Sequence, residues 1–301
     1  MKYVFILNPL AGVGANEMTL RKAIDALDEV DDCVLYVTKR PQDATAYVRK
    51  WCEKHPGETV RFIACGGDGT INEVVNGAVG HENVSVSCYP CGSGNDFVKV
   101  FGGADKFLDV SSLIHAPESK IDLLKIGNRY SVNVVNFGFD TTVAIQVQKD
   151  RAKTGHGNKN SYTKGILIAI VNSMRNKFLV KADGALMNPE GEGLFCTIAN
   201  GQYVGGSFKC APRAVIDDGL IEVCVFKPVS RIRIPFLIGT YIRGEHLDKE
   251  NLKDIIVYRR AKSVEVEAPE GFAYSIDGEI VFQNHFTVEI AEKALNFAVP
   301  V

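Results

Sequence analysis

Three glycines surround an aspartate in Gly66–Thr70, between two apolar stretches of the chain. The preceding run, Val60–Ala64, predicts a short buried strand, and the apolar residues after Thr70 recur at helical spacing. Thr70 and Glu73 predict a capping box at the start of that helix. A glycine turn that ends at a helix N-terminus presents free N–H groups and the positive end of the helix dipole. We therefore predict an anion site with phosphate as its usual occupant, the alternative being a tight turn without a ligand.

Two carboxylates follow separate predicted strands, Asp68 in this turn and Asp96 in the loop Gly92–Phe97. Carboxylates beside a phosphate site suit Mg²⁺, which typically takes one or two of them together with phosphate oxygens and waters. The sequence predicts a metal role for Asp68. It leaves Asp96 open between a metal ligand and the N-cap of the next helix.

The first part of the chain alternates predicted strands with predicted helices. Such alternation is typical of a parallel sheet covered on both faces, with ligands at the carboxyl ends of its strands. The strands are expected near 3–7, 34–37, 60–64 and 84–89, and the helices near 16–29 and 44–53.

From about Ile121, short apolar runs separated by Asp-Gly and Gly-Asn turns predict an antiparallel sheet or sandwich. One of these runs, Tyr130–Phe137, is expected as a single strand. Helices are expected near Tyr162–Met174 and Ile234–Arg243.

Composition excludes several classes of function. The 301 residues carry a net charge of −2, so no global charge favours nucleic acid. The eight cysteines include one CxxC, Cys88–Cys91, and a zinc ribbon would need a second pair. Reduced thiols and a cytoplasmic protein are expected. No stretch approaches the ~20 apolar residues of a spanning helix.

The ordered set of motifs resembles the diacylglycerol kinase and sphingosine kinase catalytic superfamily, and is most similar to its soluble bacterial lipid kinases. The set comprises Gly66–Thr70, Asn72-Glu73, Asn76-Gly77, Gly92–Phe97, Asn200-Gly201, Gly205-Gly206, Ala211-Pro212, Ile216–Leu220 and Ser275–Glu279. Their order and spacing agree over nearly the whole chain. Ser93 stands where the family usually has threonine, which keeps the hydroxyl.

The resemblance implies a phosphofructokinase-like α/β nucleotide domain over 1–120 and about 292–301. It implies an antiparallel β-sandwich over 121–291, with the active site in the cleft between the domains. The implied reaction is ATP-dependent transfer of the γ-phosphoryl group to a lipid hydroxyl, with diacylglycerol as the first acceptor to consider. The alternatives are another lipid (a sphingoid base, ceramide, phosphatidylglycerol or monoacylglycerol), a soluble alcohol or NAD, or a catalytically silent nucleotide-binding protein.

ATP and Mg²⁺ are the implied cofactors, and a membrane lipid is the implied partner. We expect transient peripheral contact with a membrane surface, no nucleic acid, and a homodimer as an open alternative. The main-chain amides at the glycine turn are our candidates for the phosphate cradle, and the resemblance adds the residues of the neighbouring loops. The expected nucleotide site comprises Asn8, Gly12, Thr38, Gly66, Gly67, Asp68, Gly69, Thr70, Asn72, Gly92, Ser93 and Asn95.

Asp277 and Glu279 flank Gly278 in the late motif, and the resemblance makes one of them the base for the lipid hydroxyl and the other its support. We assign Glu279 as the base, while a plain hairpin turn remains the alternative. Lys164 matches a lysine that the resemblance places near this acid pair. Otherwise it would be a solvated helix lysine.

A second metal site, for Mg²⁺ or Ca²⁺, is implied around Asp217–Leu220. Asp218 would supply a carboxylate, and Val215 and Leu220 main-chain carbonyls. The alternative is an ordinary β-turn.

The run Lys149–Lys164 holds five basic residues, Lys149, Arg151, Lys153, Lys159 and Lys164. We expect a loop that meets ATP phosphates or anionic lipid headgroups. A solvated loop is the alternative.

Overall fold

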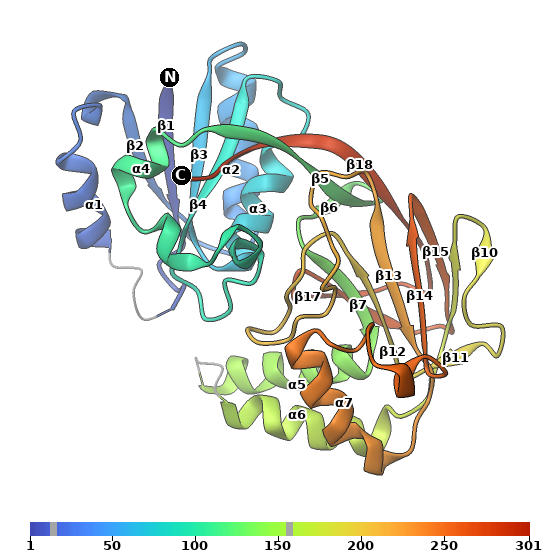
Figure 1. The fold of residues 1–301 in the computed structure, drawn as a ribbon. Helices are drawn as coiled ribbons and strands as arrows, with labels where there is room; N and C mark the ends of the chain where they lie inside the picture. Colours follow the sequence, from blue (N-terminus) through green and yellow to red (C-terminus); the bar gives the residue numbers. More distant parts are fainter. Residues whose placement is uncertain (13–16, 155–158) are drawn as a thin grey trace. The chain divides into compact units, whose positions relative to one another are not determined.

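The chain is described here by a computed structural model that covers residues 1–12, 17–154 and 159–301, with only the backbone for 151–154 and 159–163. It divides into two compact units (Figure 1). Unit 1 comprises Met1–Leu123, Ile216–Asp218 and Ala291–Val301, and unit 2 comprises Leu124–Val215 and Gly219–Ile290. No helix in the described ranges is long and apolar enough to traverse a bilayer.

Unit 1 is an α/β unit whose strands and helices alternate along the chain. Its elements are β1 (Lys2–Leu7), α1 (Glu17–Asp25), β2 (Cys33–Val37), α2 (Asp43–Lys54), β3 (Val60–Gly66), α3 (Asp68–Ala78), β4 (Val84–Pro90) and α4 (Val110–Ile114), with short 3₁₀ turns η1 (Val30–Asp32), η2 (Phe97–Phe101) and η3 (Ala104–Phe107). The expected helix over 16–29 therefore ends earlier, at Asp25, and the helix expected after Asp96 is only a 3₁₀ turn.

The strands of unit 1 form a parallel sheet in the order β2-β1-β3-β4. The end of β18 (His285–Ala298) continues it, parallel to β4, with Asn296 opposite Ser85. Consecutive residues of β3 point to opposite faces of the sheet, and each contacts a helix. Phe62 meets Trp51 of α2 edge to face, while Arg61 points to α4. The predicted parallel sheet with helices on both faces is confirmed.

Arg61 shows how this sheet holds a helix end. It is buried, and its guanidinium donates to the carbonyls of Leu113 and Ile114 at 2.7 and 3.0 Å. It also forms an ion pair with Glu118 at 2.7 Å. These bonds satisfy carbonyls at the C-terminus of α4 that have no partner within the helix.

The predicted capping box at Thr70 and Glu73 is wrong. The helix α3 begins three residues earlier, at Asp68 with Gly67 as its N-cap, because the carbonyl of Gly67 already accepts from the amides of Thr70 and Ile71. The Glu73 carboxylate instead accepts from the amides of Gln42 and Ala44 at 3.0 and 3.2 Å, so it caps the neighbouring helix α2. A tertiary contact has taken the place of the local one.

Unit 2 is built mainly from antiparallel strands. Its elements are β6 (Arg129–Ser131), β7 (Val134–Gly138), α5 (Phe139–Thr154), α6 (Lys159–Asn172), β8 (Asn176–Lys177), β9 (Leu179–Ala182), β10 (Ala185–Leu186), β11 (Glu192–Gly193), β12 (Phe195–Ala199), β13 (Ile221–Phe226), η4 (Arg231–Arg233), α7 (Ile234–Arg243), η5 (Glu250–Leu252), β14 (Ile256–Ala261), β15 (Ser263–Glu267), β16 (Ala273–Ile276) and β17 (Glu279–Phe282). The strand β5 (Glu118–Ile126) leads into it, and β18 leads out.

Two sheets pack face to face in unit 2. One has the order β14-β13-β12-β7-β16-β17, and the other contains β10-β9-β15 with the first half of β18. Their inner faces enclose one apolar core, in which Tyr274 stacks on Phe286 with ring centroids 4.0 Å apart. The predicted antiparallel sandwich is confirmed.

Three helices cover the outer face of the six-stranded sheet, so its central strands are buried on both sides (Figure 1). The helix α7 matches its expected range, and α6 begins three residues before the expected Tyr162. The helix α5 was not expected, because its many β-branched residues disfavour a helix locally. Phe139, Val143 and Val147 at steps of four, which pack into the same core, are the signal that could have found it.

The expected loop over Lys149–Lys164 is wrong for its described part, which is helical up to Thr154 and again from Lys159. The side chains of Arg151, Lys153 and Lys159 lie outside the described residues.

The capping role of Glu73 gives a stability prediction. Replacing it by alanine leaves two amides at the start of α2 without their acceptor, so we expect a loss of about 1–2 kcal/mol in the free energy of unfolding. Urea titration measures this loss. Glu82→Ala, at an exposed loop position, is the matched control and should change stability little. Equal stability of both variants would contradict the capping assignment.

Candidate functional site

Four loops meet at the carboxyl edge of the parallel sheet in unit 1. Asn8 follows β1 and donates from its amide to the Thr70 hydroxyl at 3.3 Å. Thr38 follows β2, and both its amide and its hydroxyl donate to the carbonyl of Leu7. The amide of Cys91 after β4 donates to the carbonyl of Gly66 at 2.9 Å. The structure therefore brings together the loops that the sequence placed at one edge.

Glycine is required where these loops touch. A Cβ atom on Gly92 would lie 2.4 Å from the Cα of Gly67, and one on Gly12 would lie 1.9 Å from the carbonyl oxygen of Cys91. Gly12 also has a φ of 60°, which favours glycine. The loops are thus packed backbone against backbone.

The first turn of α3 is open on the side-chain side of Gly69, where an added Cβ would meet no atom within 4 Å apart from its chain neighbours and the helix's own backbone. The amide of Thr70, by contrast, already donates to Gly67 at 2.9 Å. Of the amides expected to bind phosphate, that of Thr70 is therefore already used within the turn. Those of Gly66, Gly67 and Gly69 stay as candidates. The first N–H groups of a helix have no partner within it, and at the N-terminus of the eleven-residue α3 they would suit the phosphates of a nucleotide.

Asp68 and Asp96 face the same small volume at Gly94. An added Cβ there would lie 3.1 Å from Oδ2 of Asp68 and 3.3 Å from Oδ2 of Asp96. The other oxygens are held in place, because Oδ1 of Asp68 accepts from the amide of Phe97 and Oδ1 of Asp96 pairs with Lys99 at 2.5 Å. The two carboxylates form a pair, and two carboxylates with phosphate oxygens are a donor set that fits Mg²⁺.

The contacts of Asp96 test its alternative role as the N-cap of the next helix. It occupies the position before η2, but within the described residues its side chain makes no capping bond there. Asn95 instead closes the loop, with its side-chain amide bonded at 3.0 Å to both the N–H and the carbonyl of Gly92. The N-cap interpretation of Asp96 is therefore wrong.

Other expected nucleotide-site residues differ in exposure. Ser93 is exposed, whereas Asn72 is buried and its side-chain oxygen accepts from Asn76 at 3.2 Å. The cysteines near this edge are free, and burial raises the pKa of Cys91 to about 11. Protonated thiols are poor nucleophiles and metal ligands.

The two acids of the late motif in unit 2, Asp277 and Glu279, have different surroundings. Asp277 and Gly278 form the two-residue turn between β16 and β17, with φ values of 46° and 89°. Oδ1 of Asp277 accepts from the Ser131 hydroxyl and from the amides of Asn133 and Val134, at 2.7, 3.1 and 2.9 Å. Oδ2 accepts from the amide of Val132 at 2.9 Å. Both carboxylate oxygens of Asp277 thus bind the segment from Ser131 to Val134 and hold it in place.

These bonds also correct the predicted strand over Tyr130–Phe137. The chain breaks into β6 and β7 at Val132 and Asn133, whose amides turn to the Asp277 carboxylate instead of continuing one strand.

Glu279, by contrast, is half exposed and forms an ion pair with Arg129 at 2.6 Å. Nearby, Gln148 of α5 donates to the carbonyl of Gly278 at 2.8 Å. Lys164 of α6 forms an ion pair with Asp150 of α5 at 3.1 Å. Lys164 and the Asp277-Gly278 turn therefore each contact α5, at Asp150 and at Gln148. Arg129 was missed by the sequence reasoning, because nothing local links it to Glu279.

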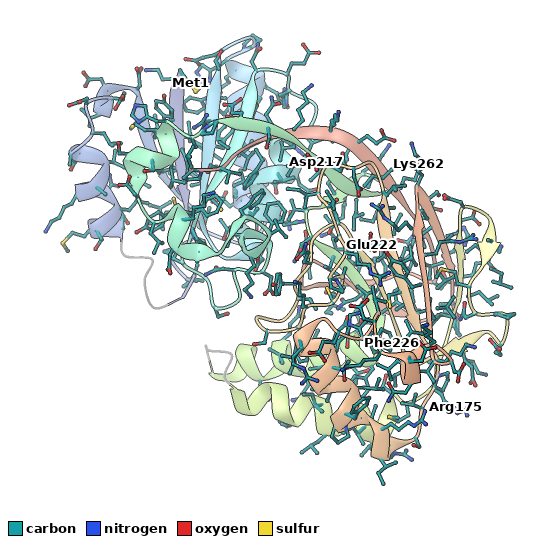
Figure 2. The ribbon with its side chains drawn as sticks, viewed as in Figure 1. Met1, Arg175, Asp217, Glu222, Phe226 and Lys262 are labelled. Atoms are coloured by element: carbon teal, nitrogen blue, oxygen red, sulfur yellow. The ribbon has the colours of Figure 1, made fainter. Side chains whose placement is uncertain are left out.

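The implied second metal site is not tested by these contacts. Within the described residues, no three or more His, Cys, Asp or Glu side chains group as metal ligands. Asp217 and its neighbours (Figure 2) are held in unit 1, where the amide of Asp122 donates to the carbonyl of Ile216 at 2.6 Å. Oδ1 of Asp122 in turn accepts from the amide of Lys293 at 2.6 Å. A metal role for Val215, Asp218 and Leu220 stays a prediction.

An apolar cavity of about 100 Å³ lies in unit 2 between the six-stranded sheet and the three helices. Phe226, at the end of β13 (Figure 2), lines it together with Val143 and Leu237. Its wall also holds Asp140, whose Oδ2 has no hydrogen-bond partner among the described residues. Burial raises the pKa of Asp140 to about 7, although a bond from Asn136 acts in the opposite direction. The sequence reasoning missed Asp140.

The comparisons with known proteins agree with this arrangement. Residues 2–126 match the family model described as the diacylglycerol kinase catalytic domain, and residues 133–299 match the YegS C-terminal NAD kinase beta sandwich-like domain.

A Klebsiella pneumoniae (strain 342) protein named as a probable lipid kinase YegS-like is 30% identical, over 97% of this chain and 94% of that protein. A diacylglycerol kinase of Bacillus subtilis (strain 168) is also 30% identical, over 72% of this chain and 70% of its own. A crystal structure described as a diacylglycerol kinase from Bacillus anthracis str. Sterne has the same fold. Its TM-score is 0.72 at 21% identity, covering 99% of this chain and 96% of that one.

The bonds of Asp277 predict that Asp277→Ala lowers the free energy of unfolding by at least about 3 kcal/mol, since buried amides lose their acceptor. Asp183→Ala is the matched control, because Asp183 also precedes a glycine in a turn, has a φ of 48° and accepts from the amides of Lys262 and Ser263. Those amides belong to an exposed turn, so water replaces the carboxylate there. Equal losses in urea titrations would show that only the turn geometry matters.

Asp140 predicts a pH effect on stability. The folded state keeps a proton on this carboxyl up to its pKa of about 7, whereas the unfolded chain releases it near 3.8. The native form therefore binds more protons between these values, and its stability falls as pH rises from about 4 to 7. The size is about 1.4 kcal/mol for each unit of pKa.

The measurement is the difference in unfolding free energy between the wild type and Asp140→Asn across that pH range. Burial lowers the pKa of His246 to about 4, which works in the opposite direction but is common to both proteins. A difference that stays constant with pH would contradict a buried neutral Asp140.

Proposed function

Because the chain belongs to the diacylglycerol kinase family of lipid kinases, we propose that it transfers the γ-phosphoryl group of ATP to the hydroxyl of a membrane lipid, with diacylglycerol as the acceptor. The family consists of phosphotransferases with an alcohol acceptor, and it implies ATP together with a divalent metal ion. The paired carboxylates Asp68 and Asp96 beside the open first turn of α3 are the observation that carries the proposal.

ATP would supply the phosphoryl group, and Mg²⁺ would neutralise its charge during transfer. The amides at Gly67 and Gly69 would bind the phosphates, and Asn8 and Thr38 would line the same edge. Asp68 and Asp96 would hold the metal ion with the oxygens that face Gly94. Lys99 orients Asp96 through its ion pair.

We assign the general base to Glu279. A base needs an available lone pair aimed at the acceptor hydroxyl. Asp277 uses both of its oxygens on the segment from Ser131 to Val134. Glu279 is half exposed, and Arg129 holds its carboxylate in position. Asp277 then acts as the positioning residue of the pair.

The apolar cavity of unit 2 supports a lipid acceptor. Cavities lined by hydrophobic and aromatic side chains with few polar groups suit an acyl chain. A soluble alcohol would find few polar partners among the described lining residues, chiefly Asp140 and the Tyr241 hydroxyl, which is already bonded to Thr197. One observation favours NAD as a second candidate acceptor, because the matched C-terminal model is described as NAD kinase beta sandwich-like.

The proposal predicts transfer of labelled γ-phosphate from ATP to diacylglycerol in mixed micelles, in a panel with a sphingoid base, ceramide, phosphatidylglycerol, monoacylglycerol and NAD. Glu279→Gln should lower kcat by about 10²–10⁴-fold, since general base catalysis contributes that much, and should change the KM for ATP little. Asp68→Asn should abolish transfer.

Glu267→Gln is the matched control, because Glu267 is also about half exposed and ion-paired, with Lys181 at 3.2 Å. Its rate should equal that of the wild type. Labelled NAD in place of lipid would favour the second candidate. ATP binding without any labelled acceptor would refute a kinase function for this site.

A further inference from the structure

Unit 2 exposes large apolar side chains along neighbouring elements. Most are more than half exposed, and the highest value is 87% for Ile232. We call this set the apolar surface. It comprises Leu167 and Val171 of α6, Ile232 of η4, and Phe236 and Ile242 of α7.

The helix α7 is apolar on both sides. Ile234, Leu237 and Tyr241 are buried against the sheet, while Phe236 and Ile242 are exposed on the other side. A helix that is apolar all round is normally buried in a core or a membrane. The exposed side of α7 therefore needs a cover that the chain itself does not provide among its described residues.

The two helices that carry the apolar surface are linked to each other through η4 and through a shared cavity. The guanidinium of Arg231 donates to the carbonyls of Ile170 and Val171 at 2.8 and 3.3 Å, which fixes η4 on the end of α6. Ile166 of α6 and Ile238 of α7 line the same cavity. Leu167 and Val171 are exposed and each lies two residues from the buried Ala169, which places them on the outer side of α6.

The two segments that carry the apolar surface contain charged residues of one sign only. Residues 164–175 and 226–243 contain no Asp or Glu, and their charged side chains are Lys164, Arg175, Lys227, Arg231, Arg233 and Arg243. Three of these pair with acids outside the two segments, among them Arg175 (Figure 2), which pairs with Glu192. Arg231 and Arg233 flank Ile232, and no acidic side chain in the described ranges pairs with either.

We propose that the apolar surface docks unit 2 on a bilayer that contains anionic lipids, with α7 lying in the interface. Apolar side chains beside arginines are the pattern of helices that insert shallowly among headgroups. A second copy of the chain is a poorer occupant, because symmetric packing would bring Arg231 and Arg233 of both copies together without any acid on this surface.

The docking deepens the proposed function and rests on it for its purpose. The inner sides of α6 and α7 line the cavity assigned above to an acyl chain, and their outer sides carry the apolar surface. A lipid would then leave the bilayer beside the helices that receive it. Binding to vesicles itself requires no turnover.

The test is co-flotation of the full chain with vesicles of phosphatidylcholine, alone or mixed equally with phosphatidylglycerol. The wild type should bind the mixed vesicles more tightly, and added salt should weaken that binding. The double variant Ile232→Ser/Phe236→Ser should bind both kinds of vesicle at least about tenfold more weakly. Arg231→Gln/Arg233→Gln should lose about thirtyfold on mixed vesicles only, roughly a factor of five for each arginine.

Two matched variants serve as controls. Leu108→Ser/Leu186→Ser removes two other exposed leucines, and Lys177→Gln/Arg259→Gln removes two exposed cations elsewhere. Both should float like the wild type. Failure of the wild type to float, or equal losses in the controls, would overturn the proposal. So would a dimer in sedimentation that only the Ile232/Phe236 variant dissociates, without vesicle binding, because the surface would then belong to a second copy.

A monomeric short-chain diacylglycerol separates the two proposals. The docking variants should phosphorylate it at the wild-type rate, and should lose activity only on diacylglycerol in vesicles. If the wild type phosphorylates neither form but still floats, the proposed function fails and the docking stands. If the variants lose activity on the monomeric acceptor as much as on vesicles while floating normally, the docking proposal fails.

Discussion

The carboxylate of Asp277 is the contact on which the position of the proposed base, Glu279, depends. One side chain accepts from the Ser131 hydroxyl and from three consecutive amides, which are buried and would otherwise lack partners. The turn between β16 and β17 is thereby fixed to the start of β7. Glu279, two residues later, is left facing outward with Arg129. The same glycine turn accepts a bond from Gln148, which ties α5 to it. The proposed roles of positioning and proton transfer would thus fall to two different acids of one motif, Asp277 and Glu279.

In unit 1 the loops hold two like charges, the carboxylates of Asp68 and Asp96, close together. Asp68 and Asp96 approach one another at Gly94 because neighbouring loops contact through glycine backbones, where any side chain would collide. The phenylalanine amide at residue 97 and the ammonium of Lys99 each hold one carboxylate oxygen. The remaining oxygens face a shared volume, where a divalent cation would relieve their repulsion. Close packing of backbone is therefore the structural basis of the candidate metal site.

The three helices of unit 2 have two apolar sides with different surroundings. Their inner sides bury the outer face of the six-stranded sheet and enclose a cavity. The outer sides of α6 and α7, together with η4, leave Leu167, Phe236 and Ile232 exposed among arginines. Exposed apolar side chains are unfavourable in water, so their transfer into a lipid surface would favour the proposed docking. Asp140 on the cavity wall is compatible with an apolar ligand when its carboxyl is neutral, and burial favours that form.

The sequence by itself determined the fold class and the loops that form the site, because glycine turns, strand runs and their order are local and regular. It predicted the parallel sheet, the antiparallel sandwich and the range of α7. Tertiary structure decided what local rules could not. Glu73 caps α2 instead of its own helix, because two amides of another segment lie within reach. The run Tyr130–Phe137 is broken by an acid 140 and more residues away. The β-branched segment after Gly138 is a helix, since Phe139 and Val143 gain more by packing on the sheet than propensity costs. Such contacts join distant segments, so no short pattern encodes them.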